Sequence, residues 1–154
     1  MAQPTETSLP PLGKDGDLPP GIYRVTLRET LRRFGTGSRQ RVAVAQRLER
    51  IYPLVIGTDQ LARFVMFGSF VSAKIEPADV DVFLLMKDTF DVGQVTGETR
   101  VLFDHAVAQA HFGASVFWLR RVAALGGEEQ TIAWWQIKRD GTRRGIIEIV
   151  EEPV

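Results

Sequence analysis

The sequence predicts an α+β domain, close to the α/β class, in which one small mixed β-sheet of about four strands is flanked by helices. Two observations support this fold class. Apolar residues recur at helical spacing after capping residues, and short apolar runs bounded by glycine lie between those segments. Helices that precede and separate strands are typical of a sheet covered by helices. With 154 residues and no cysteine, the chain fits a single domain that needs no disulfides.

The first 20 residues are expected to form a proline-rich N-terminal arm, and residues 21–154 a single domain. Proline fixes the backbone and has no N–H to donate, so the prolines of this segment favour an extended chain over a helix or strand. The leucines of the arm are spaced so that it lies along the body of the domain, at Leu9, Leu12 and Leu18.

Two helices are predicted next. The capping box that starts at Thr26 and includes Glu29 begins a short helix, which ends at Phe34 before a glycine. Ser38 is expected to cap a longer helix, which Pro53 should kink or end. The apolar residues of this second helix recur at helical spacing, at Val44, Leu48, Ile51, Tyr52 and Val55.

The rest of the chain alternates strands and helices. A strand over 63–67 runs into Gly68-Ser69, a second strand spans about 79–86, and residues 87–98 form a linker. A helix over about 99–112 ends at Gly113, with Phe103, Val107 and Ala110 toward the core. A third strand over 114–119, a short helix over about 128–135, a turn at 140–141 and a last strand over 145–150 complete the domain.

The formal net charge is zero, but it is unevenly distributed along the chain. Residues 21–50 carry eight arginines against Glu29 and Glu49, which gives 8 − 2 = +6. A basic lobe of this kind can attract an anionic partner. The alternative interpretation is a solvated, arginine-rich helix face.

The candidate chemistry lies in residues 68–81. Asp79 and Asp81 are two residues apart at the start of a predicted strand, so their side chains leave from the same face. Neighbouring carboxylates repel unless a cation lies between them, and a hard divalent cation with oxygen ligands suits such a pair. Gly68 lets backbone N–H groups approach a phosphate closely, Ser69 adds a hydroxyl donor, and Lys74 lies in the loop between. An ordinary turn, or a cap at the start of the strand, is the alternative for each feature alone.

This pattern resembles the nucleotidyltransferase superfamily, in which a Gly-Ser turn holds the triphosphate of a nucleotide and paired aspartates bind two magnesium ions. A narrower resemblance covers nearly the whole chain and points to a family of small, uncharacterised bacterial nucleotidyltransferase-like proteins. The segments that carry it are Leu18-Pro19-Pro20-Gly21-Ile22, Gly68-Ser69-Phe70-Val71, Lys74, Pro77, Asp79-Val80-Asp81, Asp140-Gly141 and Arg144-Gly145-Ile146-Ile147. The resemblance implies a nucleotidyltransferase-like core, with Asp79 and Asp81 as catalytic metal ligands.

Members of this superfamily usually have a third carboxylate on a neighbouring strand, where it binds metal and helps to deprotonate the acceptor. In this chain Ser115 stands at the position expected for that residue. A serine hydroxyl is a weak metal ligand and does not act as a base near neutral pH. Glu148 and Asp104 are the substitutes that the sequence offers. An exposed strand position is the alternative for Glu148, and a solvent-facing helix position for Asp104.

Three functions follow from these residues. The first is an enzyme that binds a nucleoside triphosphate (NTP) with Mg²⁺, two ions when the substrate is bound, and transfers a nucleotidyl group to a protein or RNA acceptor. The second is a catalytically degraded nucleotide-binding or interaction module, in which Ser115 replaces the third carboxylate. The third is an interaction protein that contacts RNA or an acidic partner through the basic lobe.

The sequence also suggests where the protein acts and with what. The chain is short, so a second copy in a homodimer, or a separate protein, is expected to complete an acceptor site. It has no uninterrupted apolar run of about 18 residues and no export signal at its start, which predicts a cytoplasmic protein with no membrane partner. By analogy, small members of the superfamily often belong to two-gene toxin–antitoxin or defence modules.

Three other motifs are weaker candidates. His105 and His111 are six residues apart on a predicted helix and point in different directions. The segment 35–38, Gly-Thr-Gly-Ser, precedes a helix but lacks the Lys-Ser/Thr of a P-loop, so a helix cap is favoured. Core packing or an interface is the default interpretation for the tryptophans, with base stacking as the alternative, at Trp118, Trp134 and Trp135.

Overall fold

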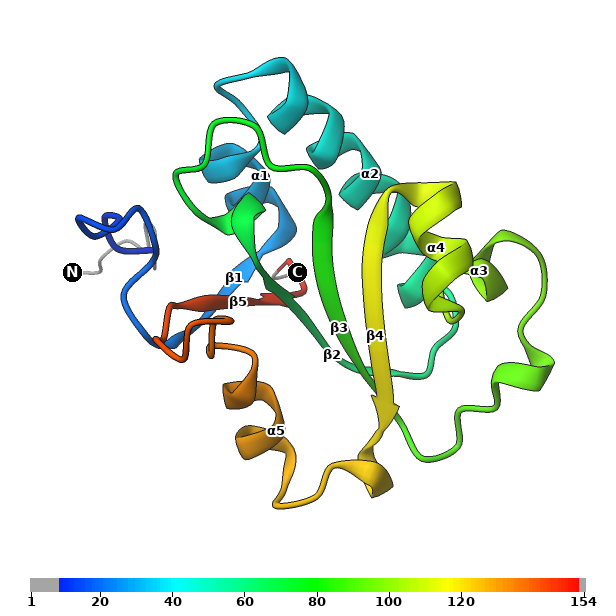
Figure 1. Ribbon diagram of the computed structural model, residues 1–154. Helices are drawn as coiled ribbons and strands as arrows, with labels where there is room; N and C mark the ends of the chain where they lie inside the picture. The colour runs from blue at the N-terminus through cyan, green and yellow to red at the C-terminus, as the bar shows by residue number, and fades with distance from the viewer. Residues whose placement is uncertain (1–8, 153–154) are drawn as a thin grey trace.

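The computed structural model describes residues 9–152, which form the predicted α+β domain around a mixed sheet (Figure 1). Part of the predicted arm, residues 1–8, lies outside the described residues. The sheet has five strands in the order β1-β5-β2-β3-β4, one more than expected. Their bounds are β1 Ile22–Thr26, β2 Leu61–Phe67, β3 Val80–Met86, β4 Ala114–Arg120 and β5 Ile146–Val150. The helices are α1 Leu27–Phe34, α2 Arg39–Ile56, α3 Gly97–Val101, α4 His105–Phe112 and α5 Glu128–Trp134, and three short 3₁₀ turns cover Ser69–Val71, Val92–Gln94 and Arg121–Ala123.

The strand pairing decides which residues meet at the candidate site. β2 pairs antiparallel with both β3 and β5, whereas β1 pairs parallel with β5 and β4 pairs parallel with β3. The end of β2 therefore lies beside the start of β3, with Phe67 opposite Asp81. The start of β4 lies at the same edge, with Ser115 opposite Asp81. Segments far apart in the sequence thus converge at one end of three adjacent strands.

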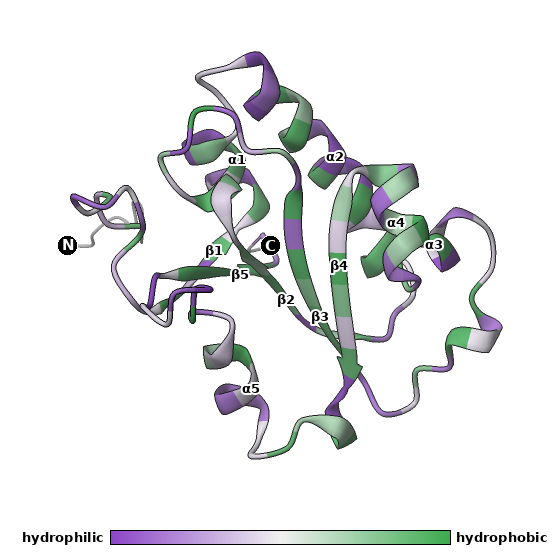
Figure 2. Cartoon of the chain, in the orientation of Figure 1, coloured by the Kyte–Doolittle hydropathy of each residue, from purple (hydrophilic) through white to green (hydrophobic). Residues whose placement is uncertain are grey.

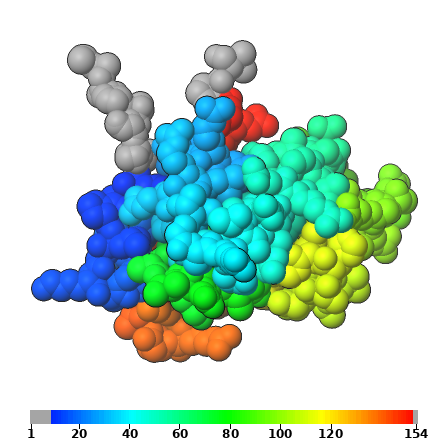
Figure 3. All heavy atoms as spheres, turned by 90° about the horizontal axis from the view of Figure 1, so that it is seen from above, coloured from blue at the N-terminus to red at the C-terminus, as the bar shows by residue number. Residues whose placement is uncertain are grey.

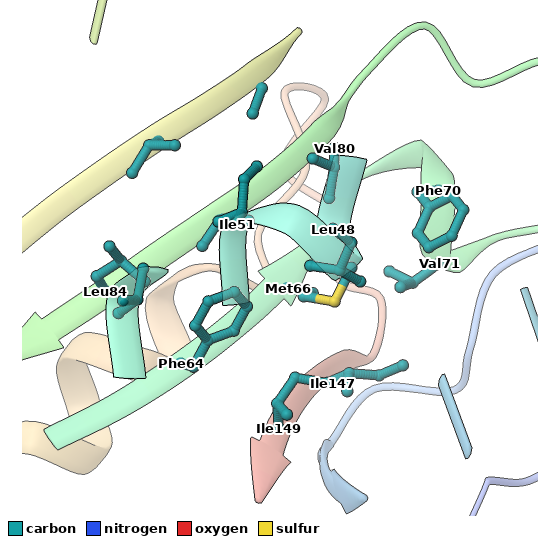
Figure 4. Close-up of a cluster of buried hydrophobic side chains, with 14 of the residues drawn as sticks. Leu48, Ile51, Phe64, Met66, Phe70, Val71, Val80, Leu84, Ile147 and Ile149 are labelled. Atoms are coloured by element: carbon teal, nitrogen blue, oxygen red, sulfur yellow. The ribbon is translucent and has the colours of Figure 1, made fainter. Parts of the chain in front are cut away.

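Helices α1, α2 and α4 cover one face of the sheet and bury the larger hydrophobic core. In Figure 4, Leu48 and Ile51 of α2 lie among strand side chains that include Phe64, Met66 and Leu84. All five of these side chains are fully buried. Burial of large apolar side chains stabilises a domain by about 1.5–3 kcal/mol each before the entropy cost is counted, so this layer holds β2 and β3 in place.

Helix α5 lies on the opposite face and packs on a smaller core, which contains Phe83, Leu85 and Ile132. In Figure 2 the sheet strands are mostly green, and purple interrupts β3 near its start. Asp81 belongs to this second face, because the strand alternates and Val80 and Val82 belong to the larger core. The face that carries the carboxylates is therefore covered only in part, by α5.

The structure confirms both caps predicted at the starts of α1 and α2. Thr26 and Glu29 form the capping box of α1, and the Ser38 hydroxyl accepts the N–H of Arg41 at 3.1 Å. The long helix, however, does not end at Pro53 but continues to Ile56. Its last turn is retained because Val55 is fully buried in the core.

The helix predicted over 99–112 is in fact two helices, α3 and α4, separated by three residues. Asp104 is not a mid-helix residue: its Oδ1 accepts the N–H of Val107 at 3.2 Å and so begins α4. The break changes which side faces inward. Val107 is 45% exposed, whereas Ala108 and Phe112 are buried, so the predicted core side of this segment was wrong except for Phe103.

The described part of the arm packs on the domain. Leu9 and Leu18 are buried, as the leucine spacing predicted. Asp17 is also buried, and it forms ion pairs with Lys138 at 2.8 Å and Arg144 at 3.3 Å. These contacts tie the arm to the turn before β5. Within residues 9–152, none of the helices combines the length and the apolar character that crossing a membrane requires.

Candidate functional site

The Gly68-Ser69 turn follows β2 directly and touches Asp81. Gly68 has φ +87° and ψ −166°, a conformation that L side chains rarely adopt. A Cβ at this position would clash with Asp81 Oδ2 and lie 2.9 Å from its Cγ. Within the described part of the chain, the N–H groups of Ser69 and Phe70 and the Ser69 hydroxyl make no hydrogen bond. The turn therefore presents free donors beside a carboxylate, which is the arrangement that an anion bridged by a cation can use.

Asp79 lies close enough to Asp81 to affect the ionisation of Asp81. Burial and, after it, the negative charge of Asp79 together raise the pKa of Asp81 from 3.8 to about 6. The positive charges of Arg144 and Arg139 and the neighbouring Ser115 hydroxyl oppose this rise without cancelling it. A partly buried carboxylate held beside another carboxylate is typical of a cation or catalytic site.

Ser115 joins this pair through a small hydrogen-bond network. Its Oγ lies 3.1 Å from Asp79 Oδ2 and 2.9 Å from Gln109 Oε1, and Gln109 Nε2 donates to Asp79 Oδ2 at 3.1 Å. A hydroxyl has one proton, so it serves one of these acceptors at a time. Strand pairing also places Ser115 directly beside Asp81. The structure thus brings Ser115 to both carboxylates, at the third position that the sequence assigned to it.

The loop that follows the turn is held by Arg41, a residue that the sequence interpretation missed. Its guanidinium is buried and donates to the backbone carbonyls of Phe34 (3.0 Å), Phe70 (2.8 Å), Ser72 (2.6 Å) and Lys74. Burial lowers the pKa of Arg41 from its ordinary value, yet the carbonyl acceptors compensate the charge. In Figure 3 the green segment that contains residues 68–78 lies between the cyan helices α1 and α2 and the orange region around α5. Because its guanidinium binds carbonyls on both sides of Ser72, Arg41 attaches the loop after the Gly68-Ser69 turn to α2, and we call it the clamp of this loop.

Positive charge reaches the site from the turn before β5 rather than from the predicted lysine. Arg139 and Arg144 both lower the pKa of Asp81, which shows that their charges act on this carboxylate. Arg144 is shared with Asp17, whereas Arg139 is exposed. Lys74 is also exposed, and its backbone, not its ammonium, makes the described contacts with Arg41 and Ser72. The signal in the sequence was the cluster of basic residues that surrounds Asp140-Gly141, at Lys138, Arg139, Arg143 and Arg144.

Glu148, the other candidate for a third carboxylate, lies elsewhere on the same face. It is on β5, opposite Val65 of β2, so β2 separates it from β3. Glu148 is 7% exposed and accepts from Arg63 at 2.7 and 2.9 Å and from Arg24 at 3.0 Å. The hydrogen bond with Glu148 raises the pKa of Arg63 above its ordinary value. Glu148 is thus part of a buried ion-pair network and is neither exposed nor adjacent to Asp81.

Much of the positive charge of the basic lobe is engaged within the chain, although of its arginines only Arg41 is buried. Five of its arginines donate hydrogen bonds to carbonyls or carboxylates of the same chain: Arg24, Arg33, Arg41, Arg47 and Arg50. The count of +6 therefore overstates the positive charge that residues 21–50 offer to a partner.

Of the weaker motifs, Ser38, the two histidines, Trp118 and Trp135 make contacts within the fold. Ser38 caps α2, as the helix-cap interpretation predicted. His105 lies 3.2 Å from the carbonyl of Val116, and His111 lies 2.9 Å from Glu98, so the two rings have separate partners. Trp118 donates to the Phe103 carbonyl at 3.1 Å. Trp135 packs on Phe67 and Phe83, whereas Trp134 is 60% exposed.

The donor set fits one magnesium ion when a phosphate is also present. Among residues 9–152, no group of three or more His, Cys, Asp or Glu side chains could hold a metal alone. Mg²⁺ in nucleotide sites is nevertheless bound by one or two carboxylates together with phosphate oxygens and waters. Asp79 and Asp81 supply two such carboxylates, and the free donors at Ser69 and Phe70 supply contacts to a phosphate. The set offers less for a second ion, because Ser115 brings no charge.

The comparisons with known proteins identify a family but not an activity. No curated protein and no solved structure matches the chain significantly. Residues 10–150 match a family of unknown function, DUF6932, and this chain belongs to that family.

Proposed function

We propose that the protein is a nucleotidyltransferase-like protein that binds an NTP with Mg²⁺ between the Gly68-Ser69 turn and the carboxylates of Asp79 and Asp81. One observation carries the proposal. Gly68 has no space for a side chain because Asp81 lies against it, so donors for a phosphate and ligands for a cation are adjacent. A phosphate bridged to Mg²⁺ needs both groups together. The raised pKa of Asp81 adds support, since a divalent cation relieves the repulsion that raises it.

The transfer that such a site supports is an in-line displacement. A hydroxyl oxygen of the acceptor forms a bond to the α-phosphorus, the bond from that phosphorus to the bridging oxygen breaks, and pyrophosphate leaves. Bound Mg²⁺ would neutralise the charge that develops on the phosphate oxygens. The Gly68-Ser69 turn orients the phosphates, and Arg139 and Arg144 add positive charge. The proton of the acceptor passes to a site carboxylate or to water, because Ser115 has no basicity to receive it.

A second candidate function is nucleotide binding without turnover. Ser115 favours it, because this residue lies beside Asp81 and within 3.1 Å of Asp79, where a third carboxylate would help to deprotonate the acceptor. Glu148 does not replace that carboxylate, since Arg63 and Arg24 bind it on the other side of β2. The two candidates share the binding site and differ only in chemistry.

The acceptor in this proposal is a protein or an RNA, and a second copy of the chain or a separate protein completes the acceptor site. The helices of the described domain pack on the sheet and form its two cores, so no separate element is left over to hold a large acceptor. A chain without cysteine suits the cytoplasm, which is the compartment we propose.

Calorimetry with ATP and Mg²⁺ tests the binding site. We expect wild-type protein to bind the pair, and the double variant Asp79→Asn with Asp81→Asn to lose this binding while it remains folded. Asp59→Asn is the matched control, because this aspartate lies just before β2, at the opposite end of the strand, and asparagine tolerates its positive φ of 57°. Millimolar ATP that fails to bind wild-type protein in the presence of Mg²⁺ would refute the proposal.

A transfer assay separates the two candidates. ATP labelled on the α-phosphate is incubated with the protein and a cell lysate, and label in macromolecules is measured with and without RNase. Transfer that disappears in the Asp79 and Asp81 double variant supports the enzyme. Label that is lost on RNase treatment identifies RNA as the acceptor. Binding without any transfer supports the non-catalytic module.

A further inference from the structure

A large aromatic cavity opens next to the candidate site. It has a volume of about 710 Å³ and lies between β4 and α5, on the sheet face that carries the carboxylates and around the free edge of β4. Its walls are mainly aromatic, with Phe83, His105, Phe117, Trp118, Trp134 and Trp135. Among residues 9–152, no Asp, Glu, Lys or Arg lines it. The cavity therefore suits a flat, uncharged group and disfavours a phosphate or a metal ion.

The cavity begins two residues further along β3 and β4 than the Asp81–Ser115 pair. Asp81 pairs with Ser115, and the next pair on the same face is Phe83 with Phe117. Two residues along a strand span about 7 Å. A ribose can cover such a gap, with a phosphate at one end and a base at the other. Phosphates at Asp81 therefore place an attached base at Phe83 and Phe117.

The aromatic side chains combine a fixed floor with an open rim. Trp135 packs between Phe67, Phe83 and Phe117, with ring centroids 4.5, 5.1 and 5.2 Å away, so these rings hold one another in place. Phe117 is 39% exposed and Trp134 is 60% exposed. Exposed aromatic faces on a rigid support are a stacking platform, since every base presents a π-face.

The rim also carries neutral hydrogen-bonding groups. Gln130 and Thr131 of α5 line the cavity, and within the described residues neither side chain makes a hydrogen bond. An amide both donates and accepts, as the edge of a base requires. An apolar peptide segment would leave these groups unpaired, which favours a base as the occupant.

We propose that this cavity binds the base of the nucleotide, stacked on Phe117 and Trp134. This inference rests on the proposed function, because it takes the phosphates to lie at Gly68, Ser69, Asp79 and Asp81. The base then contributes affinity that a triphosphate alone does not have. The cavity also determines which bases the protein accepts, through the edge contacts at Gln130 and Thr131.

The test compares three probes in the presence of Mg²⁺: ATP, inorganic tripolyphosphate and adenosine. Stacking on aromatic side chains gives about 1–3 kcal/mol per base, which corresponds to roughly 5- to 150-fold in affinity. We expect wild-type protein to bind ATP at least about fivefold more tightly than tripolyphosphate. Trp134→Ala should remove most of that advantage and leave the affinity for tripolyphosphate unchanged.

Further variants separate stacking from damage to the fold. Trp134→Phe should restore most of the ATP affinity, because it keeps an aromatic ring. Phe117→Leu should weaken ATP binding but not tripolyphosphate binding, while retaining apolar volume. Val122→Ala, at an exposed residue that does not line the cavity, is the control and should change neither affinity.

The outcomes distinguish this inference from the proposed function. Equal affinities for ATP and tripolyphosphate in wild-type protein, or an equal loss of both in Trp134→Ala, would overturn the base site and leave the phosphate site standing. If tripolyphosphate with Mg²⁺ does not bind but adenosine does, the phosphate site fails and so does the joint site proposed here. An affinity for ATP that depends on both Trp134 and the Asp79–Asp81 pair supports both proposals.

Discussion

Replacing Asp81 with asparagine should stabilise the metal-free protein against unfolding at neutral pH. In the folded protein the pKa of Asp81 is raised from 3.8 to about 6, by burial and by the charge of Asp79. The folded state therefore binds a proton at this carboxyl more tightly than the unfolded chain does. A shift of about two pKa units corresponds to about 3 kcal/mol. Asparagine resembles the protonated carboxyl and avoids the cost of holding the charge in the fold.

The stability difference between wild type and Asp81→Asn should depend on pH in a definite direction. Below pH 4, Asp81 is protonated in most of both states, and wild type and variant should have similar stability. As pH rises from 4 to 6, the unfolded chain releases its proton first, so the wild type loses stability relative to the variant. Above pH 6 the difference should level off at about 3 kcal/mol in favour of Asp81→Asn. The difference between the two proteins removes from the comparison the titration of every group that does not interact with Asp81.

Urea unfolding in the presence of a chelator, at half-unit steps from pH 4 to 8, measures this difference. Asp59→Asn is the control and should show no such change with pH. Mg²⁺ added together with ATP should raise the stability of the wild type more than that of Asp81→Asn, since the variant keeps only one of the two carboxylates that bind the ion. A variant that is less stable than wild type at pH 7.5, by an amount independent of pH, would show that the Asp81 carboxylate is a structural group and refute the reasoning.

Three further predictions concern residues around the site. Arg41→Lys should cost about 2 kcal/mol in urea unfolding and make the loop 69–74 faster in hydrogen exchange, because one ammonium cannot reach the carbonyls that the guanidinium satisfies; unchanged exchange in that loop would contradict the clamp. Glu148→Gln should lower stability by about 2–3 kcal/mol, because it leaves Arg63 without its buried partner. It should leave the affinity for ATP with Mg²⁺ unchanged, and a selective loss of that affinity would instead make Glu148 a site residue. Ser115→Asp should tighten Mg²⁺ binding in calorimetry and lower the melting temperature of the metal-free protein, since a third carboxylate would lie beside Asp79 and Asp81; a melting temperature unaffected by both the substitution and Mg²⁺ would count against the site.

Local patterns in the sequence were enough to predict most of the fold. The capping residues Thr26 and Ser38 located the starts of α1 and α2, and short apolar runs located β2, β3, β4 and β5. The missed strand, β1, is only five residues long and runs directly into α1. It pairs parallel with β5, and its partner for Ile22 is Ile146 at the other end of the chain. A parallel pair needs no hairpin turn, so neither strand indicates the other in the sequence.

The candidate site also had residues that the sequence predicted and residues that it did not. The period of a strand brings Asp79 and Asp81 to one face, and the order of the elements brings Ser115 beside them. Arg41 could not be recognised as a clamp, because its partners are backbone carbonyls whose positions no side chain reveals. Its spacing was still informative: Arg41 precedes Val44 by three residues and Leu48 by seven, so it lies on the buried face of α2. A charged residue on an apolar helix face needs partners, and those partners are the loop of the candidate site.

The energetics of the site support a role in binding rather than in folding. Arg41 uses a buried guanidinium to hold the loop after Gly68, and the close packing of Gly68 on Asp81 allows no side chain there. Both features constrain the backbone around a carboxylate pair that is unfavourable in the metal-free protein. Groups kept in an unfavourable arrangement by their surroundings are characteristic of sites whose cost is recovered when a ligand binds. The magnesium-bound phosphate that we propose would lower this cost, because it places positive charge at Asp79 and Asp81 and accepts hydrogen bonds at Ser69.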